Sequence, residues 1–270
     1  MSAIILASTE NMPYQEWLEL RKRGIGGSDA SVVCGLNRYK APVELWMEKT
    51  DQLPYQEAGE AAYWGTQLEA LVRDEFTKRT GIEVIHTHQL LQSEEQPFML
   101  ANLDGVCEHP ELGTCVFEAK TASAFKASEW ENGIPDEYQL QVQHYLSVTG
   151  YAGAYIAVLI GGNTFRWKFI ERDEELISML IQLEENFWGC VQDLVPPVLD
   201  GSNASAINGV VTRITLEKST SKGGKPFALF NFEAVSTLSP EETAMAKAFG
   251  QQFMENVNLN EVASDLPEVS

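Results

Sequence analysis

Positively charged residues are scarce in this sequence. Its 270 residues include 19 lysines and arginines against 39 aspartates and glutamates, which gives a formal net charge of -20. Because contacts to phosphate need lysine and arginine, this balance argues against a general nucleic-acid binder with a basic surface. It leaves open a protein that confines its positive charge to a channel. The basic residues are unevenly spread, and one short stretch contains Arg21, Lys22, Arg23, Arg38 and Lys40.

Long apolar runs are also missing. No run reaches the roughly 18 residues of a membrane-spanning helix, so no membrane association is expected. The apolar segment Ile4–Ala7 has no basic residue before it, which argues against a secretory signal and predicts a cytoplasmic location. With 44% hydrophobic and 10% aromatic residues, the chain can still form a full hydrophobic core.

Metal sites built from cysteine or histidine are not expected. The spacings of Cys34, Cys107, Cys115 and Cys190 match no zinc ribbon or iron–sulfur pattern, and we interpret all of them as reduced thiols. Cys107 and Cys115 are expected to approach each other across a hairpin. His86 and His88 alternate on a predicted strand, but no cysteine or histidine completes a site with them.

Hydrophobic periodicity predicts an α/β protein. Helices are expected at residues 13–23, 41–49, 61–79, 136–149 and 173–191, with a further helix opening at the glycine-rich segment 24–33. Strands are expected at 84–92, 99–107, 114–121, 152–160 and 164–170. Glu108–Gly113 reads as a hairpin loop, and Gly161–Asn163 as a tight turn. This order predicts a mixed central sheet flanked by helices.

The chain is expected to change character after Pro197. We therefore predict one domain over residues 1–197 and a small appendage over 198–270, formed by a β-hairpin (210–216 and 226–235), a helix starting at Ser239 and an acidic tail. The hairpin carries Lys218, Lys222 and Lys225 beside several phenylalanines. It is either an ordinary hairpin with a phenylalanine core or a small platform for single-stranded DNA. The acidic tail could dock a partner protein.

The clearest chemical pattern is Asp104 followed by Glu118-Ala119-Lys120. Residues two apart on a strand face the same side, so Glu118 and Lys120 project together while Phe117 and Ala119 point to the opposite face. If the strand 99–107 pairs with 114–121, Asp104 lies beside Glu118. Two carboxylates next to a lysine suit metal-assisted phosphodiester cleavage, with Mg²⁺ as the ion and Mn²⁺ as an alternative. The same residues also fit a turn at Asp104 and a solvated Glu118–Lys120 pair.

Further motifs occur in a defined order around this pattern. Gly65-x-x-x-Glu69 precedes it, and Gln141-x-x-x-Tyr145 follows it. The order GxxxE, D, ExK, QxxxY resembles the RecB-like branch of the PD-(D/E)xK nuclease superfamily, with a restriction-endonuclease-like core. Trp17-x-x-x-Arg21 and Gly26-Gly27-Ser28 resemble the N-terminal signature of lambda-exonuclease and YqaJ-type viral recombinases. The resemblance runs from about Pro13 to Trp188.

This resemblance implies a role for each matching residue. Asp104 and Glu118 would be metal ligands, with Glu69 as a third, direct or through water, and Lys120 would be the catalytic lysine. Gln141 would set the lysine or the water, and Tyr145 would pack or hydrogen-bond nearby. Arg21 and Ser28 would hold the 5′-phosphate of the digested strand, which suits an arginine fork and the backbone N–H groups of a helix start.

The sequence departs from the family at two places. The family often has serine two residues before the metal-binding aspartate, whereas this chain has Asn102, which can also hydrogen-bond a phosphate. The segment beyond Pro197 has no counterpart in the family core.

Structural alternatives remain for several residues. Glu69 could pair with Arg73 one turn further along its helix. Gln141 could lie on a helix surface and Tyr145 in the core, and Arg21 could belong to a charged helix end. His144 is expected on the helix surface rather than as a ligand.

The resemblance implies a Mg²⁺-dependent 5′→3′ exonuclease acting on double-stranded DNA ends. Such an enzyme leaves 3′ single-stranded DNA for phage-type recombination, with a single-strand annealing protein as partner. It also implies a homotrimeric ring, encoded by a phage or prophage and working in the cytoplasm of a bacterial host. The alternatives are an endonuclease of the same fold, which circular DNA would reveal, and a non-catalytic DNA-end or protein-binding module.

Overall fold

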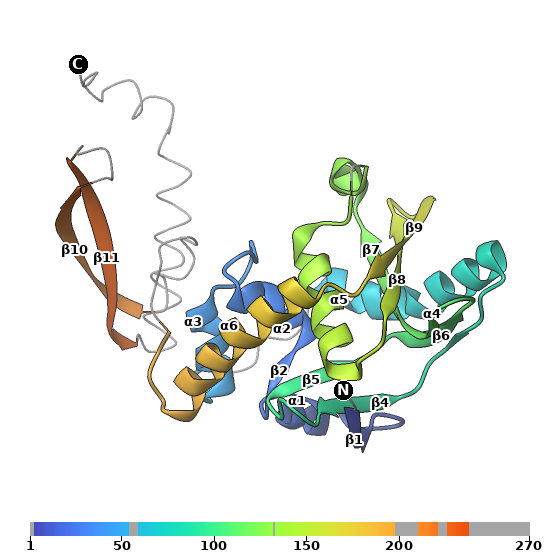
Figure 1. Ribbon diagram of the computed structural model, residues 1–270, viewed down its shortest axis with the longest axis horizontal. Helices are drawn as coiled ribbons and strands as arrows, with labels where there is room; N and C mark the ends of the chain where they lie inside the picture. The colour runs from blue at the N-terminus through green and yellow to red at the C-terminus, as the bar shows by residue number, and fades with distance from the viewer. Residues whose placement is uncertain (1–2, 54–58, 132, 198–209, 221–225, 238–270) are drawn as a thin grey trace, which may run out of the picture. The chain divides into compact units, whose positions relative to one another are not determined.

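The computed structural model describes residues 3–53, 59–131, 133–197, 210–220 and 226–237 (Figure 1). The chain divides into two units. Met1–Asn37 and Leu45–Val195 form the first, and the second takes Arg38–Glu44 with Pro196–Ser270. Among the described residues, no helix combines the length and the hydropathy needed to cross a bilayer.

A five-stranded mixed sheet lies at the centre of the first unit. Its order is β3 (Val84–Ile85), β6 (Gly105–His109), β7 (Gly113–Ala122), β8 (Gly153–Ile160) and β9 (Thr164–Glu171). β7 and β8 run parallel and the other neighbours are antiparallel, which confirms the predicted mixed sheet. Cys107 pairs with Cys115 across β6 and β7, and all four cysteines are free thiols, as predicted.

The two faces of this sheet are covered by different helices. On one face, Val116, Ile156 and Val158 pack with Val142 and Leu146 of α5 (Asp136–Thr149). On the other face, the cluster contains Val72 and Phe76 of α4 (Glu60–Thr80) together with Phe117, Ala119, Tyr155 and Ala157. The alternation along β7 therefore places Phe117 and Ala119 on the face opposite Glu118, as the strand period predicts.

A second, four-stranded sheet was not predicted. Its order is β1 (Ala3–Ser8), β4 (Gln89–Ser93), β5 (Met99–Asn102) and β2 (Ile25–Gly26). The predicted single strands 84–92 and 99–107 were wrong, because each is divided between the two sheets. His88, which has a positive φ of 50°, lies between β3 and β4. Leu103 and Asp104 form the crossing between β5 and β6, so Asp104 sits where the two sheets meet.

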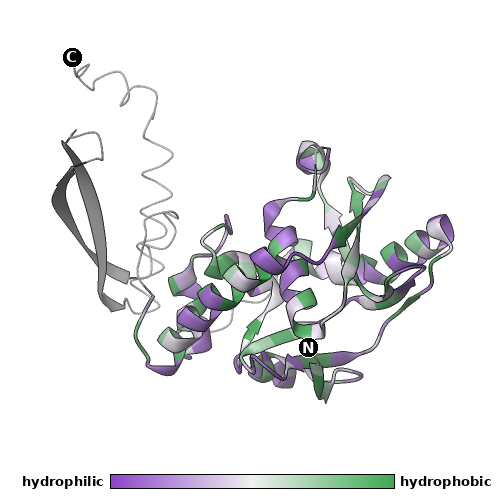
Figure 2. Ribbon diagram, in the orientation of Figure 1, coloured by the Kyte–Doolittle hydropathy of each residue, from purple (hydrophilic) through white to green (hydrophobic). Residues whose placement is uncertain are grey.

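The remaining helices begin and end close to the predicted bounds. They are α1 (Tyr14–Arg21), α2 (Gly27–Val33), α3 (Pro42–Lys49) and α6 (Glu174–Gln192), and the short 3₁₀ helix η1 (Ala124–Trp130) was not predicted. Asp173 caps α6, since its Oδ1 accepts from the backbone N of Glu175 at 3.1 Å and of Leu176 at 3.0 Å. Hydrophobic and hydrophilic residues alternate around α6 in Figure 2, as in a helix with one buried face.

The described part of the second unit contains an antiparallel hairpin. β10 (Val210–Thr220) pairs with β11 (Pro226–Thr237), which confirms the two predicted strands and extends both. The predicted helix at Ser239 and the acidic tail lie outside the described residues, as do Lys222 and Lys225.

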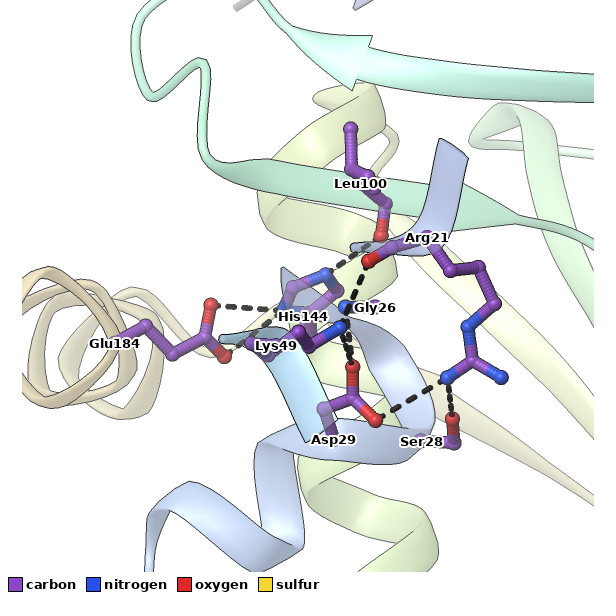
Figure 3. Close-up of polar contacts among 8 residues, drawn as sticks. All are labelled: Arg21, Gly26, Ser28, Asp29, Lys49, Leu100, His144 and Glu184. Carbon is purple, nitrogen blue, oxygen red and sulfur yellow. Dashed lines mark hydrogen bonds and ion pairs between the residues drawn. The ribbon is translucent and has the colours of Figure 1, made fainter. Parts of the chain in front are cut away.

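The prediction that His144 lies on a helix surface was wrong. His144 is fully buried, because α5 packs against the sheet on one side and against α6 on another. Its Nδ1 lies 2.8 Å from Glu184 Oε1 of α6, and its Nε2 lies 2.9 Å from the backbone O of Leu100 in β5 (Figure 3). Both ring nitrogens therefore face acceptors, which requires a doubly protonated imidazolium.

The charge of His144 makes the stability of the fold depend on pH. Burial alone would lower the pKa of His144, but Glu184 outweighs it, with a smaller contribution from Asp29, and the pKa is raised above its ordinary value of 6.5. A raised folded-state pKa means that the stabilisation is complete below pH 6.5 and is lost as the pH rises through the folded-state value.

We expect Glu184→Gln to lower the free energy of unfolding by about 3–5 kcal/mol at pH 6, because it leaves a buried charge without its partner. The difference from the wild type should shrink as the pH rises above 6.5. Urea titrations between pH 6 and pH 9 measure both effects. Glu185→Gln, at an exposed position next along the chain, is the matched control. A pH-independent difference between Glu184→Gln and the wild type would contradict a charged His144.

Candidate active site

One cleft in the first unit brings together all the predicted site residues. It has a volume of about 500 Å³ and is formed by side chains from α1, α2, α4, β5, β7 and α5, together with Asp104 between β5 and β6. The predicted residues that line it are Arg21, Ser28, Glu69, Asn102, Asp104, Glu118, Lys120, Gln141 and Tyr145.

Asp104 and Glu118 form the acidic centre of the cleft. Gly105 pairs with Phe117 across β6 and β7, which places Asp104 beside Glu118. The backbone N of Ala119 donates to Asp104 Oδ2 at 2.8 Å, and the two carboxyl groups lie within hydrogen-bonding reach of each other. Glu118 is buried, and its Oε2 has no hydrogen-bond partner within the described part of the chain. Two adjacent carboxylates of this kind need a proton or a cation between them.

The raised pKa values of the carboxyl groups in the cleft indicate that these groups lack a compensating positive charge. Burial, followed by the charge of Asp104, raises the pKa of Glu118 to about 8 and that of Glu69 to about 7. Burial also raises the pKa of Asp104. Since a bound cation would favour the ionised carboxylates, and hard oxygen donors suit Mg²⁺, the residues present fit a magnesium ion.

The third carboxylate is less closely placed than the first two. In the described residues, no three acidic, histidine or cysteine side chains are already grouped around one point to hold an ion. Glu69 is nevertheless near enough for its charge to raise the pKa of Glu118. Asp104 and Glu118 are thus the adjacent pair, and Glu69 faces them from α4.

Lys120 is held by a buried hydrogen-bond network. Its Nζ lies 2.7 Å from Glu118 Oε1 and donates to Gln141 Oε1 at 3.0 Å. Gln141 Nε2 donates to Glu118 Oε1 at 2.6 Å and to the Tyr145 hydroxyl at 3.0 Å. Burial opposes the charged form of Lys120, but Glu118 and Asp104 outweigh it, and the pKa of Lys120 is raised. Lys120 therefore carries its positive charge inside the cleft.

These contacts decide between several of the structural alternatives. The Glu118–Lys120 pair is not solvated, because the two side chains are only 2% and 18% exposed. Gln141 is buried rather than on the helix surface, and Tyr145 is both a core residue and a hydrogen-bond partner. Arg73 Nη1 donates to the backbone O of Asp104 at 3.1 Å, and its charge lowers the pKa of Glu69.

Arg21 and Ser28 meet at a wall of the cleft that α1 and the start of α2 form. Arg21 Nη2 donates to Ser28 Oγ at 2.9 Å (Figure 3). The guanidinium lies over the Trp17 ring, with 4.9 Å between the guanidinium carbon and the ring centroid. The same Nη2 lies 3.2 Å from Asp29 Oδ1. A cation oriented in this way on a cleft wall can bind a phosphate group.

Sequence reasoning missed two residues behind this wall. Asp29 Oδ2 accepts from the backbone N of Gly26 at 3.1 Å at the start of α2, and Asp29 Oδ1 also pairs with Arg21. Lys49 was not considered, although its Nζ lies 2.8 Å from Asp29 Oδ2. The position of Asp29 next to Ser28 was a usable signal, whereas the pairing of Lys49 depends on how α3 packs.

Comparisons with known proteins identify the family of this chain. The family model described as the YqaJ-like viral recombinase domain matches residues 16–152, about half of the chain. The chain belongs to this family. The predicted resemblance is therefore confirmed, and the matched residues of the YqaJ-like domain contain the whole set that lines the cleft.

Known proteins that are similar to this chain include a curated relative and a solved exonuclease structure. The uncharacterized protein YqaJ of Bacillus subtilis (strain 168) is 48% identical over 208 residues, which cover 75% of this chain and 64% of YqaJ. The alkaline exonuclease LHK-Exo of Laribacter hongkongensis has a TM-score of 0.53 at 19% identity, over 67% of this chain and 93% of LHK-Exo. The structure of LHK-Exo in complex with dAMP has a TM-score of 0.53 at 20% identity. The likeness to LHK-Exo confirms the predicted fold.

Gly27 joins two motifs of the YqaJ-like domain. A Cβ atom at this position would lie 2.4 Å from Cε1 and 2.7 Å from Cζ of Tyr145. The start of α2 can therefore rest on the Tyr145 ring only if residue 27 has no side chain. This contact sets the wall that carries Ser28 against the helix that carries Gln141.

We expect Gly27→Ala to lower the free energy of unfolding by about 1–3 kcal/mol, because the methyl group would displace the Tyr145 ring. Thermal or urea denaturation measures this loss. Gly189→Ala is the matched control, since a Cβ there meets no atom within 4 Å and alanine favours the interior of α6. Equal stability of Gly27→Ala and the wild type would show that α2 and Tyr145 do not depend on this close contact.

Proposed function

We propose that this protein is a Mg²⁺-dependent exonuclease that digests one strand of duplex DNA in the 5′→3′ direction from an end. The observation that supports this most strongly is the shared cleft, which contains the paired carboxylates, a lysine and the Arg21–Ser28 pair. The product would be 3′ single-stranded DNA for phage-type recombination in a bacterial host cell.

Asp104 and Glu118 would hold the metal, with Glu69 as a third ligand, direct or through water. When bound, Mg²⁺ polarises the scissile phosphate and lowers the pKa of a water molecule. The buried Oε2 of Glu118, which has no hydrogen-bond partner in the part of the chain that the structure describes, and the raised pKa values of Glu69 and Glu118 support this assignment. Mn²⁺ has the same preference for oxygen ligands and could replace Mg²⁺.

Lys120 would act on the phosphate itself. Its ammonium is fixed by Glu118 and Gln141 and remains charged, so it can stabilise the negative charge that develops on the phosphate oxygens or orient the attacking water. Gln141 connects Lys120, Glu118 and Tyr145, which holds the ammonium in one position. Asn102 lines the same cleft and can donate to the DNA backbone.

The direction of digestion would follow from the phosphate site. A terminal 5′-phosphate held by Arg21 and Ser28 places the first nucleotides of that strand along the cleft, toward the carboxylates. An endonuclease needs no such terminal group, and a non-catalytic module needs no paired carboxylates with a charged lysine. Because the chain spans 64% of the length of YqaJ, the activity of the whole protein is part of this proposal.

An assembled ring would reconcile DNA binding with a net charge of -20. We propose a homotrimer in which the basic side chains face a central channel, and a single-strand annealing protein as the partner that takes the product. Both proposals rest on the family resemblance.

We expect metal-dependent loss of one strand from linear duplex DNA with 5′-phosphates, and no cleavage of closed circular DNA. EDTA should abolish the activity, and Lys120→Ala should reduce it roughly 10²–10³-fold, because a fixed charge at the phosphate is removed. Gel assays with each strand labelled measure both. Lys168→Ala, at an exposed position on β9, is the matched control. Cutting of the circle would favour the endonuclease, and inactivity in both Mg²⁺ and Mn²⁺ would favour the non-catalytic module.

Arg21 is expected to set the preference for phosphorylated ends. Arg21→Ala should remove a charge-assisted hydrogen bond to the 5′-phosphate and reduce the ratio of rates on 5′-phosphoryl and 5′-hydroxyl ends by about tenfold or more. Initial rates on the two substrates measure this ratio. Arg23→Ala, an exposed arginine two residues away, is the control. An unchanged ratio in Arg21→Ala would exclude Arg21 from the phosphate site.

A further inference from the structure

Asp29 is a buried carboxylate shared by two cations. Its Oδ1 lies 3.2 Å from Arg21 Nη2, and its Oδ2 lies 2.8 Å from Lys49 Nζ (Figure 3). Lys49 Nζ also donates to the backbone O of Arg21 at 2.8 Å. Burial alone would raise the pKa of Asp29, but the charges of Lys49 and Arg21 outweigh it and hold the pKa well below its ordinary value.

The three side chains differ in how far they reach the cleft. Arg21 lines the cleft and is 26% exposed, whereas the side chains of Asp29 and Lys49 are 8% and 6% exposed. Arg21 can thus contact a ligand in the cleft, while Lys49 can act there only through Asp29 and Arg21.

The positive charge of Lys49 weakens the hold of the Asp29 carboxylate on Arg21. A buried carboxylate requires a positive partner, and Arg21 alone would be drawn into that role. A phosphate entering the cleft would then compete with Asp29 for the same guanidinium. With Lys49 on the second oxygen, the negative charge of Asp29 is already balanced, and the contact with Asp29 orients Arg21 without cancelling its charge.

We propose that Lys49 is a positioning residue that balances the charge of Asp29 and thereby keeps the positive charge of Arg21 available to the terminal phosphate of DNA. This inference rests on the proposed function, because it explains how the phosphate site acquires its charge in a strongly acidic chain.

The test is the binding of 5′-phosphoryl and 5′-hydroxyl duplexes, measured by fluorescence anisotropy with Ca²⁺ in place of Mg²⁺ to prevent cleavage. Lys49→Gln keeps a hydrogen-bond donor but removes the charge, and it should reduce the preference for the phosphorylated end by about tenfold. Lys22→Gln is the matched control, because Lys22 follows Arg21 directly but pairs with Glu19 and Asp51. It should keep the wild-type preference.

The double variant Asp29→Asn/Lys49→Gln distinguishes charge from architecture. With both charges removed, residue 29 no longer competes with a phosphate for Arg21, so the preference should return toward that of the wild type. A purely structural Lys49 would leave the double variant as impaired as Lys49→Gln, and that result would overturn the proposal. If Lys49→Gln does not fold, the double variant decides alone, and loss of its preference while it remains folded overturns the proposal.

The outcomes also separate this inference from the proposed function. A wild-type protein that binds both ends equally would overturn phosphate recognition by Arg21, and the role of Lys49 with it. A wild type that prefers the phosphorylated end, together with a Lys49→Gln variant that keeps this preference, would overturn the role of Lys49 alone.

Discussion

The burial of the Glu118 carboxylate determines which groups must surround it in the cleft. A carboxylate removed from water destabilises the fold unless partners compensate, and here Lys120 and Gln141 supply them at 2.7 Å and 2.6 Å from Oε1. The second oxygen, Oε2, has no hydrogen-bond partner among the described residues, and the Asp104 carboxyl group lies within reach of Glu118, so a cation is needed at this pair. The same arrangement that would be unfavourable in a purely structural protein is suited to holding a metal ion next to a phosphate.

The packing of α2 on α5 links this centre to the proposed phosphate site. Gly27 lies against the Tyr145 ring, Tyr145 accepts from Gln141, and Gln141 holds Glu118. The wall that carries Arg21 and Ser28 is therefore linked by direct contacts to the carboxylates. The chain has a net charge of -20, and the buried Asp29 lies next to Arg21 in that wall. Because Lys49 also pairs with Asp29, we infer that the positive charge of Arg21 remains available in the cleft.

Much of the site was predictable because its determinants are local. The two-residue period of a strand places Glu118 and Lys120 on one face, and this holds whichever elements pack against β7. Helix ends follow from single residues, such as Gly81 and Gly150 at positive φ and Asp173 as a cap. The order of the motifs along the chain then indicated the family, which the match over residues 16–152 confirms.

The sequence by itself thus determined the strand carrying the chemistry, the helices beside it and the identity of the residues in the cleft. Only the tertiary structure decided where the chain crosses between two sheets at Leu103 and Asp104, that His144 is buried against Glu184, and that Lys49 reaches Asp29. The physical reason is that these features depend on which surfaces pack together. The hydrophobic periodicity of a sequence predicts only which face of a single element is buried. His144 is buried because a second helix, α6, packs over it. The position of α3 depends on a hydrogen bond from Trp46 to the backbone O of Cys190, 144 residues away in the sequence.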